Sequence, residues 1–173
     1  MDIRKYVRSI PGFPKPGIIF RDITPILSDA NCFRYSIDRL CDLFQNSGAD
    51  KVVAAEARGF MFAAGISYKL GWGLVPIRKP GKLPWKTKRR EYDLEYGTGE
   101  LHIHTDAVAN GEKVLLIDDL LATGGTAKAM INLVEDLGGV VVGLGFVIEL
   151  DDLKGRKMLD GYRVESLEHY EGE

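Results

Sequence analysis

Two adjacent aspartates, Asp118 and Asp119, stand directly after the apolar segment 114–117. Neighbouring carboxylates repel each other, so a pair at the end of a buried segment indicates a shared partner that donates hydrogen bonds. Segment 122–126, Ala-Thr-Gly-Gly-Thr, offers backbone N–H groups, two hydroxyls and two glycines that let a ligand approach the backbone closely. Because a helix start behind such a loop favours anions, the pattern predicts a phosphate site beside a site for sugar hydroxyls.

This glycine loop does not match two common nucleotide-binding motifs. A P-loop needs a lysine after its last glycine, and a dinucleotide fingerprint needs G-x-G-x-x-G, which the chain lacks. The loop therefore suits one terminal phosphate better than a triphosphate or a dinucleotide. The alternative is an ordinary turn into a helix with solvated aspartates. A position after a buried strand, where parallel sheets bind ligands, favours the ligand site.

Cations that could bind a larger anion are concentrated in one stretch. Residues 78–90 carry seven Lys or Arg, although the chain of 173 residues has a net charge of −2 and a pI near 6.0. That balance gives the whole molecule no general attraction to nucleic acid or to an anionic membrane. Proline and glycine place Arg78, Lys79 and Lys82 just after an apolar strand, and Arg58 lies at another strand–helix junction. A solvated basic loop is the alternative interpretation.

Apolar segments alternate between strand-like and helix-like patterns along the chain. The expected strands are 51–55, 73–77, 90–97, 99–106, 113–118 and 140–150, with an edge strand near the end. The expected helices are 2–10, one that follows Ser28-Asp29 and ends before Gly48, 60–71 and 126–138. Continuous apolar strands predict a mainly parallel sheet with helices on both faces. We therefore expect one α/β domain over 1–173, with an added hairpin.

The cysteines and histidines, which could also take part in chemistry, indicate no further site. Cys32 and Cys41 form no C-x-x-C pair and are expected to be packed thiols of a cytoplasmic protein. The first residues lack a signal-peptide pattern, and no segment has membrane-spanning length. His102 and His104 share one strand face but have no third ligand nearby, so we expect no protein-held metal.

The segment VLLIDDLLATGGT, together with others, resembles a known family. It is similar to the phosphoribosyl pyrophosphate (PRPP) signature of the type I phosphoribosyltransferases. PGIIFRDITPIL, EARGFMF, IRKPGKLP and LEYGTGELHIH resemble, in the expected order, the adenine-specific members over roughly residues 11–150. The resemblance implies a type I phosphoribosyltransferase-like fold with an N-terminal base-binding hood (1–30) and a basic loop and flap (79–104). It also implies transfer of phosphoribose to adenine, giving AMP and pyrophosphate in purine salvage, by a cytoplasmic homodimer.

The resemblance also assigns roles to residues. The 5-phosphate would lie on Ala122, Thr123, Gly124, Gly125 and Thr126, and the ribose on Asp118 and Asp119. Pyrophosphate would bind Arg58, Arg78, Lys79 and Lys82, with Mg²⁺ held mainly by PRPP and not directly by the protein. Adenine would meet backbone groups of Ile19 and Arg21 between Phe20 and Leu120. Glu95, beside Tyr96, is the candidate catalytic carboxylate.

Several alternatives stay open at this point. Phe20 could be a core anchor for the proline-rich segment, and Glu95 an outward residue of a strand. The acceptor could be xanthine, hypoxanthine or orotate instead of adenine. A ligand-sensing regulator that binds nucleic acid would need an added domain or a basic face, and the chain has neither the length nor the charge. The expected partners are therefore small molecules, with no nucleic acid and no membrane.

Overall fold

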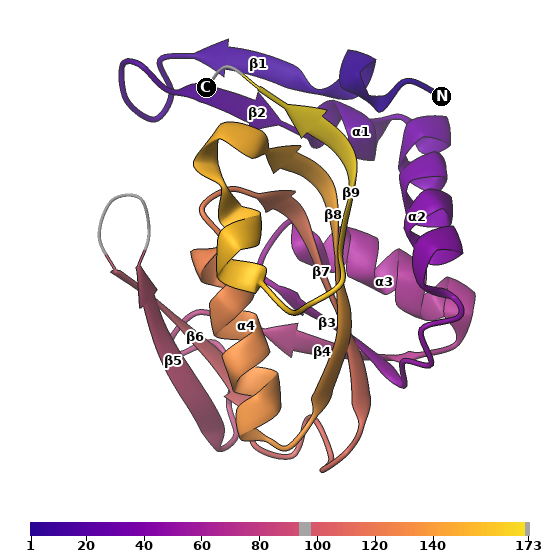
Figure 1. Ribbon diagram of the computed structural model, residues 1–173, viewed down its shortest axis with the longest axis vertical. Coiled ribbons are helices and arrows are strands. Elements are labelled where there is room, and N and C mark those ends of the chain that lie inside the picture. Colours follow the sequence, from indigo (N-terminus) through magenta and orange to yellow (C-terminus); the bar gives the residue numbers. More distant parts are fainter. Residues whose placement is uncertain (94–97, 172–173) are drawn as a thin grey trace.

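A five-stranded parallel sheet forms the centre of the protein, in the computed structural model that describes residues 1–93 and 98–171 (Figure 1). Its strands lie in the order β4-β3-β7-β8-β9, and each neighbouring pair is parallel. Their bounds are β3 Lys51–Ala55, β4 Gly73–Ile77, β7 Lys113–Leu121, β8 Val140–Leu150 and β9 Val164–Tyr170. The predicted α/β class with a parallel core is confirmed.

The strand order reverses its direction between β3 and β7. From β3 the chain moves outward to β4, then returns to the other side of β3 and continues through β7, β8 and β9. At such a switch point the connections leave to opposite faces of the sheet, so a crevice opens outside the carboxyl ends of the strands. Asp118 and Asp119 lie on β7, beside this crevice.

Helices cover both faces of the sheet. They are α2 Ala30–Phe44 and α3 Gly59–Leu70 on one face and α4 Gly125–Asp136 on the other, with the short α1 Thr24–Ser28 near the N-terminus (Figure 1). On β3 the side chains alternate: Val52 and Ala54 pack with α2 and α3, whereas Val53 and Ala55 pack in the core below α4. Burial on both faces explains why the strand reads as a continuous apolar run.

The N-terminal segment differs from its prediction. The expected helix over 2–10 was wrong: η1 Ile3–Tyr6 is a single 3-10 turn capped by Asp2, and β1 Arg8–Pro11 follows. β1 pairs with β2 Ile19–Asp22 as an antiparallel hairpin, which lies beside the end of β9 (Figure 1). Pairing of the two strands overrides the helical spacing of Ile3, Val7 and Ile10, of which only Ile3 is fully buried.

A second hairpin, predicted from its alternating residues, leans on α4. It consists of β5 Thr87–Asp93 and β6 Thr98–His104 and joins the sheet through a bridge between Arg78 and His102. Its first strand begins three residues earlier than predicted. The chain ends with η2 Asp151–Leu153, η3 Gly155–Leu159 and the edge strand β9. Among the described residues, no helix is both long and apolar enough to cross a membrane.

Candidate functional site

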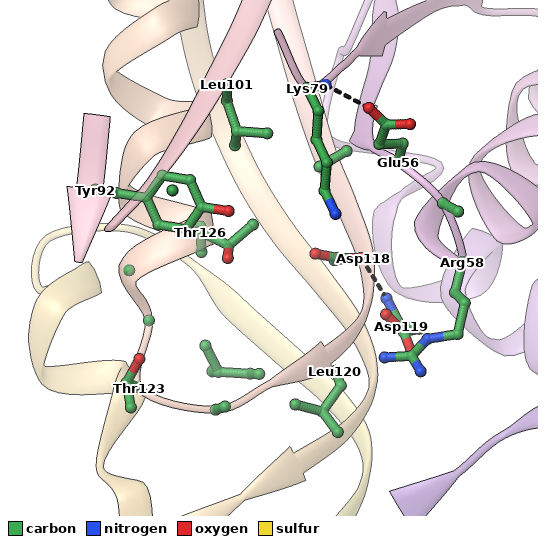
Figure 2. Close-up of a pocket in the computed structure, with 18 of the residues that line it drawn as sticks. Glu56, Arg58, Lys79, Tyr92, Leu101, Asp118, Asp119, Leu120, Thr123 and Thr126 are labelled. Atoms are coloured by element: carbon green, nitrogen blue, oxygen red, sulfur yellow. Dashed lines mark hydrogen bonds and ion pairs between the residues drawn. The ribbon is translucent and has the colours of Figure 1, made fainter. Parts of the chain in front are cut away.

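A cleft of about 690 Å³ opens at the carboxyl ends of β3 and β7. The loops after β3 and β4 form one wall, and the β5–β6 hairpin forms another (Figure 2). The end of β7 and the glycine loop 122–126 complete it. The switch point of the sheet therefore holds a cavity large enough for a sugar phosphate and a further group.

The two aspartates of β7 lie in this cleft. The backbone N–H of Asp119 donates to Oδ1 of Asp118 over 2.9 Å, which fixes the first carboxylate against the strand. Nε of Arg58 lies 2.6 Å from Oδ2 of Asp119 in an ion pair without hydrogen-bond geometry. No described residue donates a hydrogen bond to this buried oxygen. A carboxylate oxygen that is buried and lacks a donor fits a ligand hydroxyl.

The electrostatics of the pair disfavour the charged form of Asp118. Desolvation at the floor of the cleft raises the pKa of the Asp118 carboxyl well above its ordinary value of 3.8, and the charge of Asp119 raises it further. The α3 helix begins at Gly59, whose Cβ, if present, would lie 2.7 Å from Oδ1 of Asp118. Close packing of this helix start therefore shields the carboxyl, and Asp118 is only partly exposed.

We expect the variant Asp118→Asn to be more stable than the wild type at neutral pH. Asparagine keeps the acceptor for the Asp119 N–H but carries no charge to desolvate. Because the pKa in the folded state is raised, ionisation costs the wild type stability as pH rises from 3.8 through that raised value. Thermal unfolding across this range should show a midpoint gain that is near zero at the acidic end and grows with pH. A gain independent of pH would contradict this account.

The glycine loop turns directly into α4. Gly124 has φ +87°, a left-handed conformation that favours glycine, and it is the residue before the helix starts at Gly125. Thr123 and Thr126 stand on either side of the two glycines (Figure 2). N–H groups at the start of a helix are free of intrahelical partners and favour an anion. The predicted phosphate loop thus combines a left-handed glycine with the start of a helix.

Glu56 organises the cationic wall of the cleft. Its Oε1 accepts a short hydrogen bond from the Lys79 backbone N–H, and its Oε2 accepts one from Nη2 of Arg78 over 3.2 Å. The Lys79 N–H, followed by the Arg78 side chain, lowers the pKa of Glu56. Figure 2 shows the Lys79 ammonium directed into the cleft toward Asp118. Two loops that carry the predicted cations are therefore tied together by one carboxylate.

Most of the residues predicted for the PRPP site come together in this cleft. Its lining includes Arg58, Lys79, Asp118, Asp119, Ala122, Thr123, Gly124, Gly125 and Thr126. Arg78 lies behind the wall, tied to Glu56, and Lys82 is not among the described residues that line the cleft. Glu95 and Tyr96 fall outside the described residues.

Sequence reasoning missed Glu56 and the hairpin residues Tyr92 and Leu101, which also line the cleft. The available signals were weak. Glu56 stands two residues before Arg58 at the end of a strand, and the hairpin side chains alternate along β5 and β6.

Three of the predicted base-binding residues, Ile19, Phe20 and Arg21, lie on β2 and outside the lining of the cleft, whereas the fourth, Leu120, lies on β7 and lines it. A hydrogen bond from Gly12 N to Ile18 O sets the alternation of the hairpin, so the backbone groups of Ile19 and Arg21 face away from β1. The Phe20 ring packs edge-on against Phe13, with centroids 5.2 Å apart.

Two arginines connect this hairpin to its surroundings. The Arg58 guanidinium carbon lies 5.4 Å from the Phe20 ring centroid, and Arg58 also reaches Asp119 in the cleft. The Arg21 side chain lies over the Tyr170 ring at 4.6 Å and donates to Oγ of Ser9. Contacts of this kind are attractive through the ring quadrupole, so they help to hold the hairpin beside the cleft.

Comparisons with known proteins agree on one family. The protein-family model of the phosphoribosyl transferase domain matches residues 30–172. An adenine phosphoribosyltransferase of Thermotoga neapolitana is 58% identical over 167 residues, which are 96% of this chain and 98% of the relative.

Solved structures agree with this match. An adenine phosphoribosyltransferase from Thermoanaerobacter pseudethanolicus superimposes with a TM-score of 0.94 at 54% identity, covering 97% of this chain and 98% of that one. The Saccharomyces cerevisiae enzyme, complexed with D-2,5-dideoxy-2,5-imino-altritol 1,6-bisphosphate and adenine, gives a TM-score of 0.89 at 38% identity. Coverage is 95% of this chain and 96% of the yeast chain.

Proposed function

The chain belongs to the phosphoribosyltransferase family, and on this premise we propose that it transfers the 5-phosphoribosyl group of PRPP to adenine. The products are AMP and pyrophosphate, the reaction of purine salvage. One observation carries the proposal: a phosphate loop, a carboxylate pair and two cations share one cleft, in a chain whose close relatives are adenine phosphoribosyltransferases. These three features match the 5-phosphate, the ribose diol and the pyrophosphate of the donor.

We assign the parts of PRPP to the parts of the cleft. The N–H groups and hydroxyls of the loop 122–126 bind the 5-phosphate at the start of α4. Asp118 and Asp119 accept hydrogen bonds from the ribose hydroxyls, which supplies the donor that Oδ2 of Asp119 lacks among the described residues. Arg58 and Lys79, which line the cleft, bind the pyrophosphate, and Arg78 and Lys82 add positive charge in the loop after β4.

The reaction needs little covalent chemistry from the protein. A ring nitrogen of adenine attacks C1 of the ribose as the bond to pyrophosphate breaks, through an oxocarbenium-like state. The aspartates hold the ribose, and the Asp119 carboxylate places negative charge near the developing cation, while the cations stabilise the leaving group. The β5–β6 hairpin, which brings Tyr92 and Leu101 to the cleft, limits the access of water that would hydrolyse the donor.

Adenine is placed between the cleft and the β1–β2 hairpin. Leu120, which lines the cleft, and Phe20, which contacts Arg58, would lie on its two faces. The outward backbone groups of Ile19 and Arg21 would pair with its amino group and ring nitrogens. Such a pattern rejects hypoxanthine, because an exchanged donor and acceptor would leave buried groups unpaired. Glu95, beside Tyr96, is proposed to accept or relay the purine proton.

Mg²⁺ is proposed to enter with PRPP, held mainly by the oxygens of the substrate. The Asp119 carboxylate in the floor of the cleft is a hard oxygen group beside the proposed ribose site, so the cleft fits a Mg²⁺–PRPP complex whose ion is held mainly by the substrate. The ion would neutralise charge on the departing pyrophosphate. Glu149, Asp151 and His169 form a separate cluster of possible ligands, outside the lining of the cleft.

We also propose a cytoplasmic homodimer in which hood, cleft and flap belong to one domain. Met61 and Tyr68, seven residues apart on α3, expose 44% and 91% of their surface, and Leu74 exposes 42% on the edge strand β4. Positions seven apart share one helix face, so a second copy could cover these side chains. The two buried thiols, Cys32 and Cys41, are both free, which fits a reducing compartment.

Incubation of the purified chain with adenine, PRPP and Mg²⁺ should yield AMP and pyrophosphate in equal amounts. Chelation of Mg²⁺ should stop the reaction. Hypoxanthine, xanthine and orotate, offered in competition with adenine, should yield little product. Absence of AMP would refute the proposal, and preference for another base would refute the assignment of the acceptor. Nucleic-acid binding that persists at physiological salt would favour the regulator instead.

A further inference from the structure

We infer that Arg156 is a positioning residue for the 5-phosphate loop, acting through η3 and the buried carboxylate of Glu149. Arg156 itself does not line the cleft. The inference rests on the proposed function, because it concerns the phosphate of that substrate.

The backbone of η3 lies directly against the backbone of the phosphate loop. A Cβ added to Gly155 would overlap the carbonyl oxygen of Ala122 and would lie 3.0 Å from a Leu121 methyl group. In the other direction, a Cβ added to Gly124 would lie 2.6 Å from the carbonyl oxygen of Gly155. Since no side chain separates the two backbones, a shift of η3 is transmitted directly to the loop.

Arg156 fixes η3 to the ends of two strands. Its Nε donates to Oε1 of Glu149 over 2.7 Å, and its Nη1 donates to the Val164 carbonyl over 2.8 Å. The other oxygen of Glu149 accepts from Oγ of Ser166 over 2.6 Å. The Glu149 side chain is only 3% exposed, so its charge depends on these partners.

His169 adds little to this arrangement. Its Nδ1 lies 3.8 Å from Glu149 but only 2.9 Å from Oδ1 of Asp151, to which it is hydrogen-bonded. Arg156 is therefore the main cation of the buried carboxylate. Its removal would leave the buried Glu149 with the Ser166 hydroxyl but without its close cation, and η3 without these bonds to β8 and β9.

The consequence should be confined to the phosphate of the substrate. η3 contacts the loop that binds the 5-phosphate, whereas the proposed adenine site lies on β2 and Leu120. Loss of Arg156 should therefore weaken the binding of PRPP and of ribose 5-phosphate, and it should leave the Michaelis constant for adenine unchanged. A residue with a purely structural role would not separate the two substrates in this way.

Arg163 offers a matched control. It also pairs with one carboxylate, Glu165 at 3.0 Å, and one carbonyl, that of Leu43 at 2.9 Å. Its side chain is 46% exposed, against 44% for Arg156. Arg163 joins the C-terminal segment to the end of α2, however, and not to the phosphate loop.

The test compares Arg156→Ala with Arg163→Ala. Calorimetric titration with ribose 5-phosphate and steady-state kinetics should show about 10-fold weaker binding of the phosphate ligand and a similarly raised KM for PRPP in Arg156→Ala only. KM for adenine should stay within about twofold in both variants. Arg156→Lys should recover part of the loss, because lysine can pair with Glu149 but cannot make both bonds.

An Arg156→Ala protein that binds ribose 5-phosphate as the wild type does would overturn the inference. An equal loss in Arg163→Ala, or an equal rise in KM for adenine, would also overturn it. If Arg156→Ala does not fold, Arg156→Lys decides by the same criteria. A wild type that binds ribose 5-phosphate but makes no AMP would refute the proposed function and leave the titration as a separate test.

Discussion

Asp119→Asn is expected to lower kcat/KM for PRPP by about 100-fold or more, with the fold retained. Asp119 is 5% exposed, and its Oδ2 lacks a hydrogen-bond donor in the described part of the chain. Asparagine can direct an N–H₂ group at the same place, which would face a ribose hydroxyl with a donor and remove an acceptor. It also removes the negative charge nearest to Arg58. Both changes act on a desolvated site, where they have their largest effect.

Steady-state kinetics with varied PRPP would measure this loss. Asp38→Asn is a suitable control, because Asp38 forms an ion pair of similar length with Lys69, at 2.7 Å, but lies on α2 and not in the described cleft lining. The control should keep wild-type kinetics. Activity of Asp119→Asn within a few fold of the wild type, with an unchanged thermal midpoint, would remove the aspartate pair from the proposed ribose site.

The sequence predicted the central strands well because burial dominates there. β3, β4 and β8 have the bounds expected from their apolar runs, since strands covered on both faces admit few alternatives. The end of β7 was less predictable. Its pairing with β8 continues through Leu120 and Leu121, so the strand carries both aspartates within it. Pairing partners, which sequence periodicity does not encode, decide where such a strand stops.

In the N-terminal segment, by contrast, the periodicity of apolar residues predicted the wrong element. Ile3, Val7 and Ile10 have helical spacing, but the segment is too short for propensity to hold a helix without packing. The segment instead pairs with β2, Ile10 opposite Phe20, across the proline-rich turn. A local helical pattern therefore fails where another strand pairs with the segment.

The candidate site also has a part that is local in sequence and a part that depends on contacts between separate segments. The aspartates and the glycine loop lie within nine residues, so their chemistry can be predicted from one short segment of the sequence. The tie from Glu56 to Lys79 and the contact of Gly124 with Gly155 join segments 23 and 31 residues apart. Such contacts depend on the sheet order, and only the structure reveals that these residues support the site.

The second large effect is expected from Gly124→Ala, which should raise KM for PRPP by more than about 10-fold. At φ +87° an alanine is strained by about 1–2 kcal/mol, and its Cβ would also lie 2.6 Å from the Gly155 carbonyl and 3.2 Å from Cβ of Met158. The loop must then move away from η3. Its N–H groups would no longer converge on one phosphate position, whereas the adenine site would be unaffected.

The variant Gly111→Ala is a control that separates the effect of the loop–η3 contact from the effect of left-handed backbone strain. Gly111 has φ +79°, close to that of Gly124, but a Cβ there would meet nothing within 4 Å. Both variants should therefore lose similar stability from the left-handed backbone, and only Gly124→Ala should lose affinity for PRPP and ribose 5-phosphate. Equal losses of affinity would mean that global destabilisation, and not the position of the loop, controls phosphate binding. Because the two substitutions share their backbone cost, the difference between their KM values for PRPP measures what the loop–η3 contact contributes to the site.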